Sequence, residues 1–254
     1  MEPVKIVPCL DTREGKLVKG VHFVELREIG DPADAAAAYS EAGADELVVL
    51  DITATVERRA TMIETVKRTS ERCTVPLTVG GGIANLGDME RIFDAGADKV
   101  SINTAAVKRP KLVQEAASRF GSGKVTVAVD TRKSDKCSSG FEVMVNGGRK
   151  PTGLDVLEWV RKVERFGAGA ILPTSMDADG TQAGYDIPMT KAVAQNVSIP
   201  VIASGGAGKL EHLSEVVLQA KVSAVLVASI AHFGTFTIKQ MKEHLESCGI
   251  AVNL

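Results

Sequence analysis

Eight short apolar runs, rich in β-branched residues, recur along the chain and alternate with longer stretches of helical periodicity. Strands that are buried on both faces have such near-continuous apolar runs. Alternation of strands with helices favours parallel strands joined by crossover helices. The runs are Val4–Leu10, Leu47–Ile52, Val75–Val79, Lys99–Ile102, Val125–Val129, Ala170–Thr174, Ile199–Ala203 and Ala224–Ala228.

The stretches between these runs carry helix-stop signals. Gly43, Gly96 and Gly167 follow the last turns of three of them, where a left-handed residue ends a helix. Helical periodicity is clearest in Asp31–Ala42, Val56–Ser70, Leu154–Phe166 and Leu210–Leu218.

Two inserts interrupt the alternation and are expected to be irregular. The first, Thr12–Glu25, follows the first apolar run, and the second, Arg132–Pro151, follows the fifth. The second insert alternates around Asn146-Gly147-Gly148, which predicts a small hairpin with a tight turn.

The two halves of the chain resemble each other in the placement of special residues. Asp11 and Asp130 end the first and fifth runs, and glycine-rich turns follow the third and seventh. The offsets between matching positions are 119, 125 and 125 residues, about half the chain. Together with a length of 254 residues, this predicts one (β/α)₈-barrel domain, residues 1–254, built from two half-barrels. An open doubly wound sheet is the alternative.

Composition excludes several classes of partner and compartment. The net charge is -2 with 24% charged residues, so no field of one sign is present to bind nucleic acid or an acidic membrane. The four cysteines are scattered, no signal segment opens the chain, and no apolar run approaches the roughly 20 residues that cross a bilayer. We expect a soluble cytoplasmic protein.

Opposed carboxylates are the first sign of catalysis. Polar residues at the carboxyl ends of barrel strands line the active sites of this fold. Asp11 and Asp130 would face each other across the mouth of the barrel, an arrangement suited to a general acid and a general base. The alternative is that each carboxylate caps its own loop through backbone hydrogen bonds.

The glycine-rich turns suggest two phosphate sites. Backbone N–H groups of Gly80-Gly81-Gly82 and Ser204-Gly205-Gly206 would let a phosphate approach closely. Beside them, the fourth and eighth runs end in Ser101, Asn103, Thr104 and Ser229. A single such turn is more often only a tight turn, but the duplication indicates a bisphosphorylated ligand that spans the mouth.

Other polar residues give no metal or cofactor site. The segment after the sixth run contains Asp177, Asp179 and Gly180, but it lacks the glutamate at position twelve of a calcium-binding loop. The four histidines have no ligand spacing, and neither a GxSxG nor a P-loop motif is present. Trp159 and Tyr39 lie in helical stretches, where core packing explains them.

Taken together, the motifs resemble one family, the cyclase subunits of imidazole glycerol phosphate synthase. The resemblance runs nearly end to end. It rests on PCLD at Pro8–Asp11, VKGVHF at Val18–Phe23, LDIT at Leu50–Thr53, TVGGGI at Thr78–Ile83, DKVSINTAAV at Asp98–Val107, DADGT at Asp177–Thr181, GYD at Gly184–Asp186 and ASGGAGK at Ala203–Lys209.

The resemblance implies a lyase of histidine biosynthesis, and we expect no cofactor and no metal. Its substrates would be ammonia and phosphoribulosyl-formimino-aminoimidazole carboxamide ribonucleotide, and its products imidazole glycerol phosphate and aminoimidazole carboxamide ribonucleotide. Asp11 and Asp130 would be the acid and base. Supporting residues would be Lys19, Asp51, Thr174, Asp177 and Ser204. Phosphate-binding residues would be Gly82, Asn103, Thr104, Asp179, Gly180, Gly206, Ala207 and Ser229.

The resemblance also implies a partner, a glutaminase that docks at the opposite face and sends ammonia through the barrel. The family has an Arg, Glu, Lys and Glu ring at this entrance. The matching positions here are Lys5, Glu46, Lys99 and Ala170, so coupling to a glutaminase is expected to be weakened or altered.

Two further departures concern local structure. Pro173 is expected to interrupt the sixth strand because it removes a ladder donor. The segment VLQAKVSAV replaces the Gly-Ala-Asp lead into the eighth strand.

Two other functions remain open. The sister isomerase of the same pathway shares the half-barrel pattern and the paired aspartates. A relative that binds bisphosphates without turnover is the other alternative, although binding alone does not need opposed acid and base groups.

Overall fold

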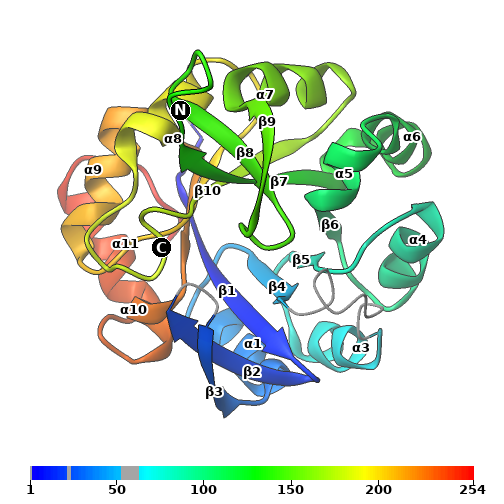
Figure 1. The fold of residues 1–254 in the computed structure, drawn as a ribbon. Coiled ribbons are helices and arrows are strands. Elements are labelled where there is room, and N and C mark those ends of the chain that lie inside the picture. The colour runs from blue at the N-terminus through cyan, green and yellow to red at the C-terminus, as the bar shows by residue number, and fades with distance from the viewer. Residues whose placement is uncertain (1, 22–23, 53–62) are drawn as a thin grey trace.

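The computed structural model describes residues 2–21, 24–52 and 63–254, with side chains outside this description at positions 19–21 and 24–27. Strands and helices alternate along the chain (Figure 1). The parallel strands are β1 (Lys5–Arg13), β4 (Leu47–Asp51), β5 (Leu77–Gly80), β6 (Lys99–Ile102), β7 (Val125–Lys133), β10 (Ala170–Ser175), β11 (Ile202–Ala203) and β12 (Ala224–Val227).

Helices surround these strands in Figure 1. The longer ones are α1 (Pro32–Glu41), α3 (Ile63–Arg72), α4 (Leu86–Asp94), α6 (Lys111–Phe120), α7 (Val156–Arg165), α8 (Ile187–Ala194), α9 (Leu210–Ala220) and α11 (Ile238–Ser247). Shorter ones are α5 (Thr104–Lys108), α10 (Ser229–His232) and a 3₁₀ turn at Ser122–Lys124.

The parallel strands form a ring. β1 pairs with β12 on one side and β4 on the other, and parallel ladders continue through β5, β6 and β7 to β10. β11 pairs with β12, and two isolated parallel bridges, Ile171 with Val201 and Thr174 with Ser204, connect β10 to the β11 segment. The eight strands of the described residues therefore make the expected (β/α)₈ barrel and not an open doubly wound sheet.

Apolar side chains pack on both sides of this ring. Alternate residues of a strand point to opposite faces, so each strand contributes to an inner and an outer layer. The inner layer consists of Val7, Cys9, Val48, Leu172, Ala224 and Leu226. The outer layer, between strands and helices, includes Ile6, Leu10, Leu47, Val127 and Trp159. Each large apolar side chain removed from water in these layers contributes about 1.5–3 kcal/mol to folding.

The helix ends agree with the sequence signals, except that one helix ends at a lysine in place of a glycine. Gly43, Gly96 and Gly167 have φ angles of 86°, 101° and 93°, as expected for residues that end helices. After α9, Lys221 adopts the left-handed conformation at φ 58°. A lysine here occupies a conformation that glycine adopts with less strain. The departure in this segment thus changes the helix end and leaves β12 in register with β1.

Both inserts form antiparallel hairpins on one face of the barrel (Figure 1). The expectation of an irregular first insert was wrong, because β2 (Lys16–Val21) and β3 (Val24–Gly30) pair with each other and β2 pairs with the end of β1. The hairpin expected in the second insert is confirmed as β8 (Phe141–Val145) and β9 (Lys150–Asp155). The first and fifth barrel strands therefore continue past their aspartates, to Arg13 and Lys133.

The expected interruption at Pro173 was also wrong. β10 runs without a break from Ala170 to Ser175, and Pro173 keeps its register with Val129 of β7. The backbone N–H of Ile171 donates to Pro200 O at 2.9 Å, on the β11 side. Because residues two apart direct their N–H groups to the same side, the missing N–H of Pro173 also belongs to that side. The proline therefore reduces the β10–β11 ladder to isolated bridges and spares the β7–β10 ladder.

No helix in the described ranges has the length and apolar character that a membrane span requires.

Candidate active site

Parallel strands bring the predicted residues to two opposite ends of the barrel. At the carboxyl ends lie most of them: Asp11, Asp51, Gly82, Asn103, Thr104, Asp130, Thr174, Asp177, Asp179, Gly180, Ser204, Gly206, Ala207 and Ser229. Lys5, Glu46 and Lys99 lie at the amino ends. Lys19 belongs to β2, and its side chain lies outside the described residues. Shared strand direction is the reason that residues far apart in the sequence meet at one mouth.

The strands that carry the two aspartates are built alike. Each aspartate is followed by a threonine and an arginine, as Asp11-Thr12-Arg13 and Asp130-Thr131-Arg132. Thr12 Oγ1 donates to Leu50 O at 3.3 Å, and Thr131 Oγ1 donates to Thr174 O at 3.3 Å. The aspartates themselves are paired in register with Leu50 and Thr174. The two halves of the mouth therefore share this threonine hydrogen bond and this register.

The junctions after β6 and β12 are equivalent as well. Asn103 has φ −124° and ψ −87°, and Ala228, 125 residues later, has φ −133° and ψ −83°. Thr104 and Ser229 are the first residues of α5 and α10. This shared backbone geometry supports the pairing of Thr104 with Ser229 that the sequence offsets predicted.

The two glycine turns also correspond. Gly81 and Gly206 have φ angles of 96° and 104°, which L-residues rarely adopt. A side chain at Gly81 would meet the backbone of Asp51, and one at Gly206 would meet the backbone of Gly184. Both turns therefore require glycine for conformation and for close packing.

Asp130 is set apart by its electrostatics. Burial and the nearby charge of Asp179 raise the pKa of Asp130 to about 7, against lowering by hydrogen bonds from the Gly148 backbone and the Asn103 side chain. The Asn103 amide contacts Asp130 through its nitrogen, and its buried Oδ1 has no hydrogen-bond partner among the described residues. An unsatisfied buried acceptor costs about 1–3 kcal/mol, so this amide is suited to receive a donor from a ligand.

The turn between β8 and β9 lies over this half of the mouth. Asn146 N donates to Thr104 Oγ1 at 3.0 Å, while Gly148 N hydrogen-bonds the Asp130 carboxyl group. Asn146, Gly147 and Gly148 all have positive φ angles, which bend the turn tightly. Figure 1 shows the β8–β9 loop reaching the middle of the ring.

Asp11 and Asp177 have different surroundings. Asp11 is buried, and the Cys9 Sγ donates to its Oδ1 at 3.6 Å. Asp177 Oδ2 accepts from Lys133 N at 2.9 Å, so one of its oxygens holds the β10 exit loop against the end of β7. Asp11 therefore lies beside a thiol, and Asp177 connects the loop after β10 to the end of β7.

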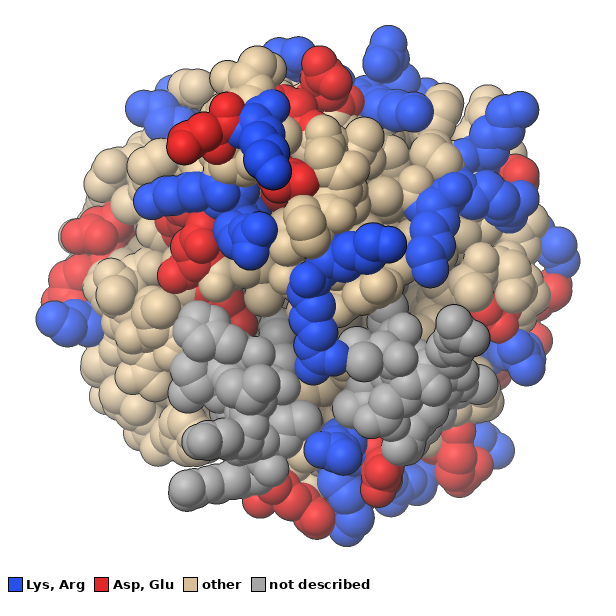
Figure 2. Space-filling view, in the orientation of Figure 1, with Lys and Arg blue, Asp and Glu red and all other residues tan. Residues whose placement is uncertain are grey.

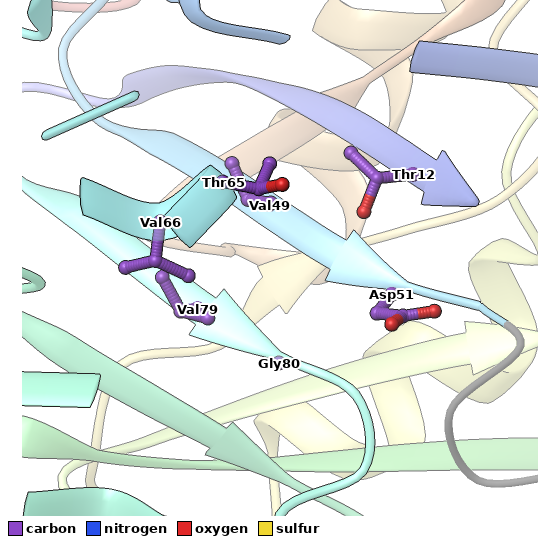
Figure 3. Close-up of a pocket in the computed structure, with 7 residues that line it drawn as sticks. All are labelled: Thr12, Val49, Asp51, Thr65, Val66, Val79 and Gly80. Atoms are coloured by element: carbon purple, nitrogen blue, oxygen red, sulfur yellow. The ribbon is translucent and has the colours of Figure 1, made fainter. Parts of the chain in front are cut away.

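A small pocket lies next to Asp51 (Figure 3). Thr12, Val49, Asp51, Thr65, Val66, Val79 and Gly80 line it. Its walls come from β1, β4, β5 and α3. Val49, Val66 and Val79 belong to the outer apolar layer, so the pocket lies behind the strand ends and not inside the ring.

The face with the hairpins carries exposed cations. Figure 2 shows Lys and Arg side chains near the middle of this face. Arg13, Lys16, Arg132 and Lys133, at the ends of β1 and β7 and the start of β2, are exposed. Positive charge around a mouth favours the arrival of phosphorylated ligands. Over the described ranges, no group of three or more His, Cys, Asp or Glu is arranged to hold a metal ion.

At the opposite end, the three predicted entrance residues meet. Glu46 accepts from Lys5 Nζ at 2.5 Å and from Lys99 Nζ at 2.8 Å. Burial alone would raise the pKa of Glu46, but the two ammonium groups outweigh it and lower the pKa. Ala170, at the start of β10, adds no charge to this cluster.

Small polar side chains lie inside the ring between the two ends. Thr78, Ser101 and Thr126 are buried on β5, β6 and β7, each between two residues of the outer layer. Alternation along a strand therefore points these hydroxyls toward the barrel axis. The Ser101 hydroxyl has no hydrogen-bond partner among the described residues.

Three features of the site were not found from the sequence. They are the Cys9 thiol beside Asp11, the position of His232 beside β1, and the turn at Asn146–Gly148 over Thr104. His232 contacts Cys9 across 223 residues, a separation at which no local pattern carries a signal. The repeated Asp-Thr-Arg triplet was a usable signal for Thr12 and Thr131.

Comparison with known proteins places this architecture in a family. The family described as "Histidine biosynthesis protein" matches residues 5–237. The chain is 52% identical over 251 residues to "Imidazole glycerol phosphate synthase subunit HisF" of Trichormus variabilis, covering 98% of both chains.

Proposed function

The chain belongs to the histidine biosynthesis protein family, and from this premise we propose that it catalyses the cyclase reaction of imidazole glycerol phosphate synthase. The enzyme is a lyase that converts phosphoribulosyl-formimino-aminoimidazole carboxamide ribonucleotide and ammonia to imidazole glycerol phosphate and aminoimidazole carboxamide ribonucleotide. The observation that carries the proposal is the full-length identity of 52% with a subunit of that name. The duplicated mouth supports it, because a substrate with two phosphates matches two equivalent halves.

Asp11 and Asp130 are the proposed acid and base. Ring closure by ammonia requires proton removal from nitrogen and proton delivery to a leaving oxygen or nitrogen. A carboxyl group is most effective in both directions when its pKa lies near the working pH. The pKa of Asp130, raised to about 7, meets that condition. Asp11 stands at the matching position of the other half, and Lys19, Asp51, Thr174, Asp177 and Ser204 are proposed to support the substrate between them.

The two phosphates are proposed to bind at the matching junctions. One site combines Gly82 with Asn103 and Thr104. The other combines Asp179, Gly180, Gly206, Ala207 and Ser229. The similar backbone angles at Asn103 and Ala228 support a common binding mode. Thr104 Oγ1 accepts from Asn146 N, and its own hydrogen can still be donated to a phosphate oxygen at the first site.

Ammonia is proposed to enter from the opposite end. The relative is named as a subunit, and a glutaminase partner at the Lys5, Glu46 and Lys99 cluster would supply ammonia there. The hydroxyls of Thr78 and Ser101 offer polar contacts along the inside of the ring. With Ala170 in the fourth position, coupling to the glutaminase is proposed to be weakened. Glutamine-driven turnover in one-to-one stoichiometry with a glutaminase would contradict that part. We propose a cytoplasmic location for the reaction, because the four cysteines are scattered along the chain.

The decisive test is ammonia-dependent turnover of the bisphosphate substrate by the purified protein, followed by product analysis. Asp11→Asn and Asp130→Asn should each reduce kcat by at least about 10²-fold while circular dichroism shows a folded barrel. Isomerase product from the sister substrate, or tight substrate binding without turnover in the unmutated protein, would replace the proposal with one of the two alternatives.

A further inference from the structure

His232 joins three elements of the barrel beside Asp11. It ends α10, and its Nδ1 lies 2.8 Å from the Tyr39 hydroxyl on α1. Its Nε2 lies 2.7 Å from the carbonyl oxygen of Cys9 on β1. The rings of Tyr39 and His232 are 5.7 Å apart and tilted by 59°. Figure 1 shows α10 and α1 on the same side of the barrel as β1.

The hydrogen-bond partners determine the tautomer of His232. A carbonyl oxygen only accepts, so Nε2 carries the hydrogen that reaches Cys9. In the neutral ring Nδ1 is then an acceptor, and it receives the Tyr39 hydroxyl hydrogen. Burial raises the pKa of Tyr39 to about 12, so the phenol keeps this hydrogen at neutral pH. The contacts form one directed chain from α1 to β1.

The chain continues to the proposed catalytic carboxylate. Cys9 accepts from His232 through its backbone and donates from its Sγ to Asp11 Oδ1 at 3.6 Å. The last pair in the β1–β12 ladder is Pro8 with Val227, so Cys9 lies just past the end of that ladder. His232 therefore binds β1 at Cys9, a residue that β12 does not pair with.

The other half of the barrel connects its junction to its aspartate in a different way. At the β6–α5 junction, the Asn103 side chain hydrogen-bonds Asp130 on the next strand. The equivalent residue at the β12–α10 junction is Ala228, which has no polar side chain to offer Asp11. Position 107, equivalent to 232, is a valine packed against the outer layer. The polar link between junction and aspartate is therefore direct in one half and runs through His232 and Cys9 in the other.

From this asymmetry we propose that His232 is a positioning residue of the cyclase site. It keeps Asp11 and Ser229, the first residue of α10, in fixed positions relative to each other. The inference rests on the proposed function. It assigns His232 no contact with the substrate. It predicts losses in catalysis that follow from misplacement of the Asp11 carboxylate and of a phosphate-binding residue.

The test compares His232→Ala, His232→Gln and Tyr39→Phe with the unmutated protein in ammonia-dependent turnover. His232→Ala should lower kcat/KM by about 10- to 100-fold, with kcat reduced through Asp11 and KM raised through Ser229. His232→Gln, whose side-chain amide can still donate to Cys9 O, should recover most of the loss. Tyr39→Phe, which leaves the imidazole without its donor, should give a smaller loss.

Val107→Ala is the matched control, because it alters the equivalent position of the other half and removes only apolar contacts. Its kcat/KM should stay within about threefold of the unmutated value. Thermal unfolding of all variants identifies a general loss of fold, and His232→Gln keeps the test valid if His232→Ala does not fold. Unchanged kcat and KM in both His232 variants would overturn the proposal. Absence of turnover in the unmutated protein would instead refute the cyclase function, and the role of His232 with it.

Discussion

The carboxyl groups of Asp130 and Asp179 lie close enough that the charge of Asp179 adds to burial in raising the pKa of Asp130 to about 7. Asp130 belongs to β7, and Asp179 to the loop after β10, the neighbouring strand. Two such carboxyl groups resist ionising together, so one proton is retained near neutral pH. The proposed acid–base group is therefore tuned by a residue from another strand.

Replacement of Asp179 by asparagine should lower the pKa of Asp130, because it removes a like charge. The limb of the pH–rate profile that belongs to Asp130 should then move to lower pH. Asp177→Asn is the control, since the Asp177 carboxylate binds Lys133 N and is not among the groups that shift the pKa of Asp130. A limb that stays in place in Asp179→Asn, or moves equally in the control, would contradict the assignment.

The same shift predicts a pH dependence of stability. The folded protein retains the Asp130 proton up to about pH 7, whereas the ordinary pKa of an aspartate side chain is 3.8. The unfolded chain therefore releases this proton first as pH rises, and the group's contribution to the free energy of unfolding is lost between about pH 4 and 7. In urea unfolding, Asp130→Asn should lose less stability than the unmutated protein between pH 5 and 7.5. Equal losses would show that Asp130 titrates alike in both states.

Breaking the buried pair of Lys242 and Asp45, near the amino ends of the strands, should destabilise the protein strongly. Lys242 Nζ lies 3.1 Å from Asp45 Oδ1, and their side chains are 7% and 6% exposed. Lys242→Ala leaves Asp45 buried without its ammonium partner, and it should reduce the free energy of unfolding by about 3 kcal/mol. Lys239→Ala, on the same helix with a side chain 79% exposed, should change it by less than about 0.5 kcal/mol. Similar values for the two variants in urea unfolding would disprove this.

Replacement of Lys221 by glycine should stabilise the protein. Lys221 adopts φ 58° after α9, a conformation that is strained for a residue with a Cβ. Glycine relieves the strain but increases the conformational entropy of the unfolded chain. The net gain in the free energy of unfolding should be about 0.5–1 kcal/mol. Lys221→Ala keeps the Cβ and tests whether loss of the lysine side chain explains the change. A gain in both variants would mean that side-chain removal is the cause and not backbone relief.

The local features were predictable because their signals lie within a few residues. Runs such as Leu47–Ile52 predicted buried strands, and Gly43, Gly96 and Gly167 predicted helix ends that the structure confirms. The hairpin at Asn146-Gly147-Gly148 was also predictable, because consecutive positive φ angles favour these residues. The first hairpin was missed because β2 and β3 contain charged residues, which obscure the apolar pattern of a strand.

By itself, the sequence determined the order of strands and helices, the two-fold placement of Asp11 and Asp130, and the family, because periodicity and motif spacing are properties of the chain. How these groups behave depends on contacts that form when the chain folds. The pKa of Asp130 depends on Asp179, Asn103 and Gly148, and the surroundings of Asp11 depend on Cys9 and His232. Those groups come from separate strands and loops. Electrostatic and hydrogen-bond energies depend on distance in space, which closure of the barrel sets and which sequence separation does not report.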